Sequence, residues 1–172
     1  MTGSTFAEAA KMARDLQALV DTTIKPPSET APSPAEPVVY MAMVRGTRGY
    51  LEKLAHQING TYSSGWYDAC AVMIRRLIET LIIGAFEAHN LQAKIKDAKG
   101  DYFRLRDLID RGIAEGSWTL RRNAKKALQR LKDVGDKSAH SRRFIARRDD
   151  IDNVLPDLRT VLHELLYLAR LK

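Results

Sequence analysis

A single histidine among cations, within residues 135–143, is the part of the sequence whose residue types best suit chemistry. The stretch reads Gly-Asp-Lys-Ser-Ala-His-Ser-Arg-Arg, and its histidine is His140. Histidine exchanges a proton near neutral pH, and arginine holds a phosphate through two hydrogen bonds. Cleavage of RNA by its own 2′-hydroxyl needs a base, an acid and a cation for the phosphorane oxygens. His140 with Arg142 or Arg143 therefore supplies part of a ribonuclease site, although these residue types also fit a histidine that caps a helix end.

Positive charge concentrates around this histidine, between Arg121 and Arg148. The whole chain has a formal net charge of +7, whereas this segment holds eleven Lys and Arg against two Asp, a net +9. Such a field attracts phosphates, and nucleic acid is the commonest phosphate-rich partner. A solvated helix face that keeps a protein soluble accounts for the same charge, so both interpretations stay open. The candidate nucleic-acid contacts are Arg121, Arg122, Lys125, Lys126, Arg130, Lys137, Arg142, Arg143, Arg147 and Arg148.

Other patterns in the sequence do not complete a site. The run His163-Glu-Leu-Leu-Tyr167 begins like the HExxH helix of zinc proteases, but a tyrosine stands where the second ligand is required. The sequence has no Cys/His cluster and no glycine-rich phosphate loop, so we expect no metal and no cofactor. Cys70, in an apolar stretch, is expected to be a small buried hydrophobe. The aromatic residues beside helix starts are interpreted as core anchors, with base stacking as the alternative: Tyr62, Trp66, Tyr67 and Trp118.

The elements that must position these residues are helices. Apolar residues recur at helical spacing, and no segment alternates with the period of a strand. Helices are expected over residues 6–23, 38–62, 69–86, 102–114, 118–134 and 150–171. The segment 69–86 is apolar around most of its circumference, which indicates a central helix. Gly135 is expected to end the basic helix, and Pro156 to kink or begin the last one. The predicted fold is an all-α, antiparallel helical bundle.

The chain is expected to have three parts. Residues 1–23 hold an amphipathic helix that opens with a capping box, Thr5 with Glu8. Residues 24–37 contain five of the six prolines and are expected to form an extended linker. Residues 38–172 form the bundle, and the tethered helix docks on its own body or on a neighbouring chain.

Nothing in the sequence predicts contact with a membrane. No apolar run reaches the roughly 20 residues that a membrane span needs. Charged residues interrupt the first twenty positions, where a signal peptide is continuously apolar. We therefore expect a cytoplasmic protein with no membrane partner.

Three short motifs resemble an uncharacterised bacterial branch of the HEPN superfamily, over about residues 38–171. They are Tyr62-x-x-Gly65-x-Tyr67-x-Ala69, Arg75-Arg76-Leu77-Ile78-Glu79, and Leu131-Lys-Asp-Val-Gly135-Asp136-Lys-Ser-Ala139-His140. The resemblance implies an antiparallel helical bundle and a homo-oligomer, most often a dimer. It also implies membership of a group that contains many ribonucleases of toxin and prokaryotic defence systems.

The catalytic motif of that superfamily is incomplete in this sequence. Active members carry Arg-x(4–6)-His, often with asparagine after the arginine. Here His140 matches the histidine, but Gly135 and Asp136 stand in place of the arginine and asparagine. Non-catalytic binding of RNA or another phosphate-bearing partner is therefore the preferred interpretation. The alternatives are a metal-independent ribonuclease that uses His140 with Arg142 or Arg143, and a structural interaction or dimerisation module.

The same motifs suggest a structural role for several polar side chains. We expect Glu79, Arg75 or Arg76, Asp136 and His140 to meet across two helices as a buried polar network. Such networks are costly when half satisfied and favour a single packing when complete.

Overall fold

The computed structural model describes residues 11–15 and 36–172, and the chain divides into two compact units, Met1–Ser33 and Pro34–Lys172. In the first unit, residues 11–15 are helical and exposed. The predicted capping box and most of the predicted proline linker lie outside the described residues.

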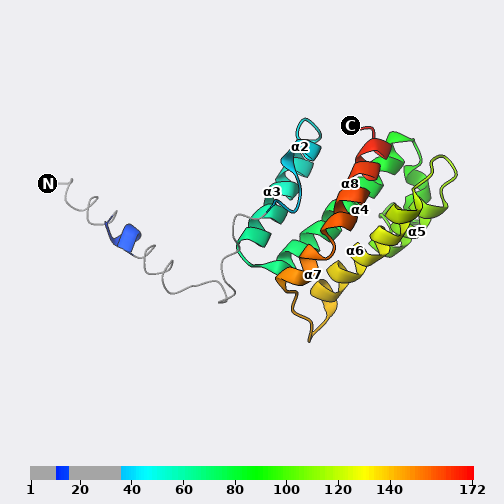
Figure 1. Ribbon diagram of the computed structural model, residues 1–172. Helices are drawn as coiled ribbons and strands as arrows, with labels where there is room; N and C mark the ends of the chain where they lie inside the picture. Colours follow the sequence, from blue (N-terminus) through cyan, green and yellow to red (C-terminus); the bar gives the residue numbers. More distant parts are fainter. Residues whose placement is uncertain (1–10, 16–35) are drawn as a thin grey trace. The chain divides into compact units, whose positions relative to one another are not determined.

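The second unit is an all-α, antiparallel bundle, as the sequence predicted. Helices α3, α4, α6 and α8 lie side by side and run alternately in opposite directions (Figure 1). Residues 36–172 contain no strand, only one isolated bridge between Lys96 and Tyr102. No helix in the described ranges is long and apolar enough to cross a membrane. The elements are α2 (Met41–Val44), α3 (Gly49–Ser63), α4 (Tyr67–Ala88), the 3₁₀ turn η1 (Gln92–Ile95), α5 (Leu105–Ala114), α6 (Arg122–His140), α7 (Arg148–Asp152) and α8 (Leu155–Leu168).

Helix α4 is the centre of the core, which confirms the prediction for this segment. It contacts α3, α5, α6, α7 and α8. Side chains such as Leu77, Ile78 and Phe86 are completely buried. Cys70 is buried on the same helix, and burial raises the pKa of its thiol to about 12. Its thiol is therefore protonated at neutral pH and acts as a small hydrophobe.

Gly135 lies within α6, so the prediction that it ends this helix is wrong. The helix continues to His140, and the backbone of Gly135 is not in the left-handed region that a helix-ending glycine adopts. A β-carbon at this position would stand 2.7 Å from Cβ of Arg75 and 3.2 Å from the carbonyl oxygen of Ala71. The glycine is needed because α4 and α6 approach closely here.

Two other predicted helices are each divided. The segment 38–62 is broken at Gly46, whose φ of +75° suits glycine. Its first residues are held outside the helix, because the amide side chain of Asn59 bonds both the N–H and the C=O of Val39. The segment 150–171 consists of α7 and α8, and Pro156 stands in the first turn of α8, where its missing N–H costs nothing.

The contact at Gly135 leads to a stability prediction. Gly135→Ala should destabilise the bundle by about 1–2 kcal/mol, because overpacking outweighs the gain in helix propensity. Urea unfolding followed by circular dichroism measures the change. The matched control is Gly60, which is also helical but has open space around it. Gly60→Ala should raise stability by about 0.5–1 kcal/mol. Equal gains for both variants would contradict the close approach.

Candidate functional site

His140 stands at the edge of a groove of about 560 Å³ between α4, α5 and α6. We call it the His140 groove. Three of its side chains, Lys132, Asp136 and His140, come from α6 at spacings of four residues, which places them on one side of the helix. The full lining is Arg75, Arg104, Arg106, Asp107, Lys132, Asp136 and His140.

His140 is the last residue of α6 and is exposed. The sequence predicted that the basic helix ends at Gly135, before His140, and that is wrong because the helix runs through Gly135 to His140. Among the described residues, its ring makes no hydrogen bond or ion pair. The imidazole is therefore open to a ligand in the groove.

An ion-pair network forms the wall of the groove. Arg75 Nε donates to Asp136 Oδ1 at 2.8 Å, and Arg75 Nη1 lies 3.7 Å from Glu79 Oε2. Lys132 Nζ lies 2.9 Å from the other oxygen of Asp136. Burial alone would raise the pKa of Asp136, but the hydrogen bonds from Lys132 and Arg75 outweigh it and hold that pKa below its ordinary value. The hydrogen bond to Asp136 in turn raises the pKa of Lys132.

Of the two arginines predicted as alternatives, Arg75 belongs to the network, whereas Arg76 is exposed and makes no ion pair with any described residue. The network differs from the predicted one in three ways. It is half-buried rather than buried, since the side chains of Arg75, Glu79 and Asp136 are 25–32% exposed. Lys132, which the sequence analysis left out, is a full member. His140 shares the groove with the network but is not bonded to it.

The groove carries more positive than negative charge. Four cations, Arg75, Arg104, Arg106 and Lys132, face two carboxylates, Asp107 and Asp136, a net +2 with the histidine neutral. Arg106 is paired with Asp107 at 3.6 Å, whereas Arg104 has no ion-pair partner among the described residues. A histidine beside guanidinium groups can bind an anion and exchange a proton with it. Arg104 and Arg106 were not predicted from the sequence, because they precede His140 by more than thirty positions.

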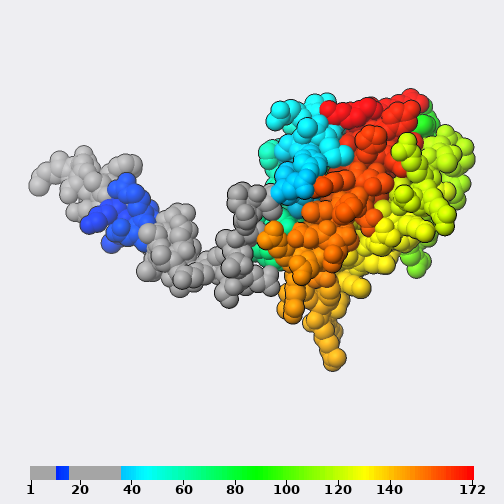
Figure 2. Space-filling model, in the orientation of Figure 1, coloured from blue at the N-terminus to red at the C-terminus, as the bar shows by residue number. Residues whose placement is uncertain are grey.

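Arg142 and Arg143, the proposed partners of His140, do not line the groove. They lie in the segment 141–147 between α6 and α7, which projects from the body of the bundle (Figure 2). Both are exposed. The structure therefore places the arginines of α4 and α5 in the groove with His140, rather than those that follow it in sequence.

The ten predicted nucleic-acid contacts fall into two groups. Three are paired with carboxylates: Arg121 with Glu164 at 3.9 Å, Arg130 with Asp157, and Arg148 with Asp152 at 3.3 Å. The other seven make no ion pair with any described residue, and we call them the unpaired cations. They are Arg122, Lys125, Lys126, Lys137, Arg142, Arg143 and Arg147.

Several of these side chains share one exposed face of α6. Arg122, Lys126, Lys137 and His140 are exposed and recur at multiples of three or four residues, together with the paired Arg130. The opposite face is buried through residues such as Leu128 and Leu131. At 1.5 Å per residue the exposed face is roughly 27 Å long.

No group of His, Cys, Asp and Glu side chains able to hold a metal ion occurs among the described residues. In comparisons with family models, with curated proteins and with solved structures, nothing matches this chain.

The ion pairs of Asp136 predict an acid-dependent contribution to stability. Because its pKa is lowered by folding, this contribution is complete above the ordinary value of 3.8 and is lost as pH falls through the lower native value. Asp136→Asn should therefore cost about 1 kcal/mol at pH 7, a small value because the pairs are partly solvated. The difference from the wild type should vanish in acid.

Urea unfolding at several pH values measures this difference. Asp133→Asn is the control, because that carboxylate is 61% exposed and its only ion pair with a described residue is a 3.4 Å contact with Lys132. A pH-independent difference for Asp136→Asn would contradict the assigned ion pairs.

Proposed function

We propose that this protein binds RNA, or another phosphate-bearing polymer, without cleaving it. The binding surface consists of the exposed face of α6, the segment 141–147 and the His140 groove. The observation that carries the proposal is the group of seven unpaired cations along α6 and in the segment 141–147. Their charge is available to a ligand, whereas that of Arg130 and Arg148 is neutralised within the fold.

The unpaired cations near the N-terminus of α6 destabilise this helix. Arg122, Lys125 and Lys126 lie in its first turns, where no acidic residue balances them. The helix dipole makes a cation at a helix N-terminus unfavourable by roughly 0.3–1 kcal/mol. Like charges four residues apart, such as Arg122 and Lys126, add a repulsion of roughly 0.2–0.5 kcal/mol. Charges that oppose the stability of their own helix are typical of a binding surface.

Phosphates are the ligand that fits this pattern. A row of cations along a helix displaces the counterions of a nucleic acid when it binds, and this release supplies most of the affinity. The resemblance to the HEPN superfamily, which stays a prediction, favours RNA among the phosphate polymers. The predicted dimer and the predicted cytoplasmic location also stay predictions.

The second candidate function is a metal-independent ribonuclease. It is favoured by the presence of Arg75, Arg104 and Arg106 in the same groove as His140. These arginines could stabilise a phosphorane while the imidazole moves a proton, although the matching position in sequence is a glycine. The ribonuclease function differs from the binding function in one observable property, the cleavage of RNA.

Binding to a fluorescein-labelled RNA tests the proposal directly. With about five phosphate contacts, the logarithm of the association constant should fall with the logarithm of salt concentration with a slope of about −3.5. The triple variant Arg122→Ala/Lys126→Ala/Lys137→Ala should lower this slope by about 2 in magnitude, because three contacts are lost.

The matched control removes three exposed cations elsewhere on the bundle, through Arg45→Ala, Lys53→Ala and Lys99→Ala. Both triple variants change the net charge equally, so only a specific surface separates them. Equal loss of affinity in the two variants, or binding that does not respond to salt, would contradict the proposed surface.

Incubation of the protein with RNA and a chelator separates the two candidate functions. We expect intact RNA, and His140→Ala should bind it with nearly the same affinity as the wild type. Cleavage that survives the chelator and disappears in both His140→Ala and Arg104→Ala would instead establish the ribonuclease. The Asp136→Asn variant controls for indirect effects on the groove.

A further inference from the structure

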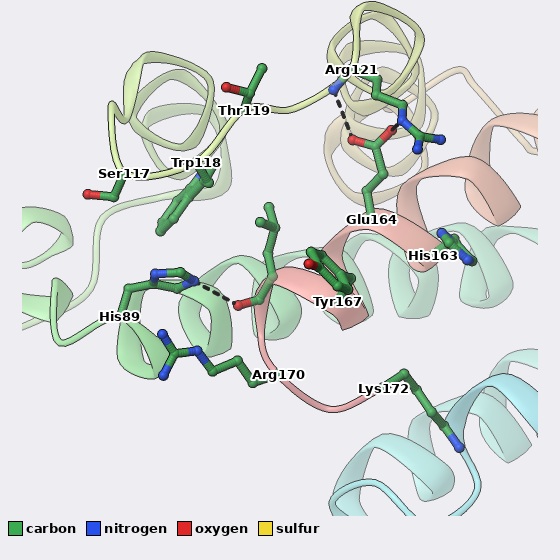
Figure 3. Close-up of a pocket in the computed structure, with 11 residues that line it drawn as sticks. His89, Ser117, Trp118, Thr119, Arg121, His163, Glu164, Tyr167, Arg170 and Lys172 are labelled. Carbon is green, nitrogen blue, oxygen red and sulfur yellow. Dashed lines mark hydrogen bonds and ion pairs between the residues drawn. The ribbon is translucent and has the colours of Figure 1, made fainter.

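A second pocket, of about 770 Å³, lies at the other end of α6. It is formed by the C-terminal ends of α4 and α8 and by residues 117–121, which lead into α6 (Figure 3). We call it the Trp118 pocket. In Figure 3, Trp118 and Tyr167 reach toward its centre, with Arg121 above them and Arg170 below.

The indole of Trp118 is rigidly held. Its Nε1–H donates to the carbonyl oxygen of Gly112 at 3.0 Å. The ring packs edge-to-face against Phe86 at 4.9 Å between ring centres and against His89 at 5.0 Å. A ring fixed on these sides offers a preformed apolar surface at little entropic cost.

Tyr167, by contrast, has an exposed side chain. Its side chain is 71% exposed, and it makes no hydrogen bond or ring contact with any described residue. An exposed aromatic ring in a pocket is available to stack on a planar ligand. Arg170, on the same rim, is also exposed and has no ion-pair partner among the described residues.

Glu164 joins the pocket to α6. One carboxylate oxygen accepts the backbone N–H of Arg121 at 3.0 Å, at the start of the helix. The other oxygen is buried and accepts no hydrogen bond from any described residue, and Arg121 Nε lies 3.9 Å away from it. An unsatisfied buried acceptor is costly, and a ligand that donates an N–H to this oxygen would remove the cost. Every nucleic-acid base carries such a donor on its edge.

The Trp118 pocket and the His140 groove lie at opposite ends of one basic helix. Arg121 lines the first and His140 the second, roughly 27 Å apart along the helix, and unpaired cations lie near both ends: Arg122 and Lys126 near the first, Lys137 near the second. A strand whose phosphates follow α6 therefore reaches an aromatic pocket at its end. A base paired within a duplex cannot enter that pocket, because its faces are already stacked.

We infer that the Trp118 pocket takes an unpaired base of the bound polymer, which makes the ligand a single-stranded RNA. The base stacks on Tyr167 and Trp118, and Arg170 holds the adjacent phosphate. This inference rests on the proposed function, since it names the class of RNA that the basic surface binds.

The test compares a labelled single-stranded RNA of about 12 nucleotides with the same sequence as a duplex. Tyr167→Ala should weaken single-strand binding about fivefold or more, the range expected for a lost base–aromatic stack. Duplex binding should not change, and Tyr167→Phe should keep the wild-type affinity for both. Tyr50→Ala is the matched control, because Tyr50 is also exposed but lies outside the pocket.

Fluorescence gives a second readout. In a Trp66→Phe background the remaining tryptophan is Trp118, and single-stranded RNA should quench it while the duplex does not. Unchanged single-strand affinity in Tyr167→Ala, with the salt dependence intact, would overturn the base pocket and leave the proposed function standing. Absence of any salt-sensitive RNA binding would overturn both.

Discussion

The close approach of α4 and α6 at Gly135 is the contact on which the rest of the arrangement depends. With no β-carbon at this position, Cβ of Arg75 lies almost against the α6 backbone. That approach brings the Arg75 guanidinium to 2.8 Å from Asp136, one residue further along α6. Arg75 and Asp136 also line the His140 groove, so a packing constraint and a charged surface lie at the same place.

The two faces of helix α6 have different roles. Its buried face, with Leu128 and Leu131, contributes to the core, and burial of apolar area supplies the energy that holds it there. Its exposed face carries cations that weaken the helix by repulsion and by opposing the dipole at its N-terminus. The core energy has to exceed this cost. A helix held by packing rather than by its own propensity can therefore present charge that an isolated helix would not tolerate.

Carboxylates divide the cations into those neutralised within the fold and those left for a ligand. Asp157 of α8 neutralises Arg130, while Asp152 of α7 and the hydroxyl of Tyr62 hold Arg148. The seven unpaired cations are not balanced by any described residue. The sequence shows how many cations lie between Arg121 and Arg148, but not which of them are neutralised within the fold.

The sequence by itself determined the all-α class, the central position of α4, the buried state of Cys70 and the basic character of α6, because each follows from local spacing and residue type. The tertiary structure alone decided that Gly135 lies within a helix, since only the proximity of α4 distinguishes a packing glycine from one that ends a helix. It also decided which arginines stand beside His140, because Arg75 and Arg104 reach it through the packing of separate helices. The Trp118 pocket could not be predicted from the sequence for the same reason. Its walls come from α4, α8 and residues 117–121, which are far apart in sequence and come together only in the folded bundle.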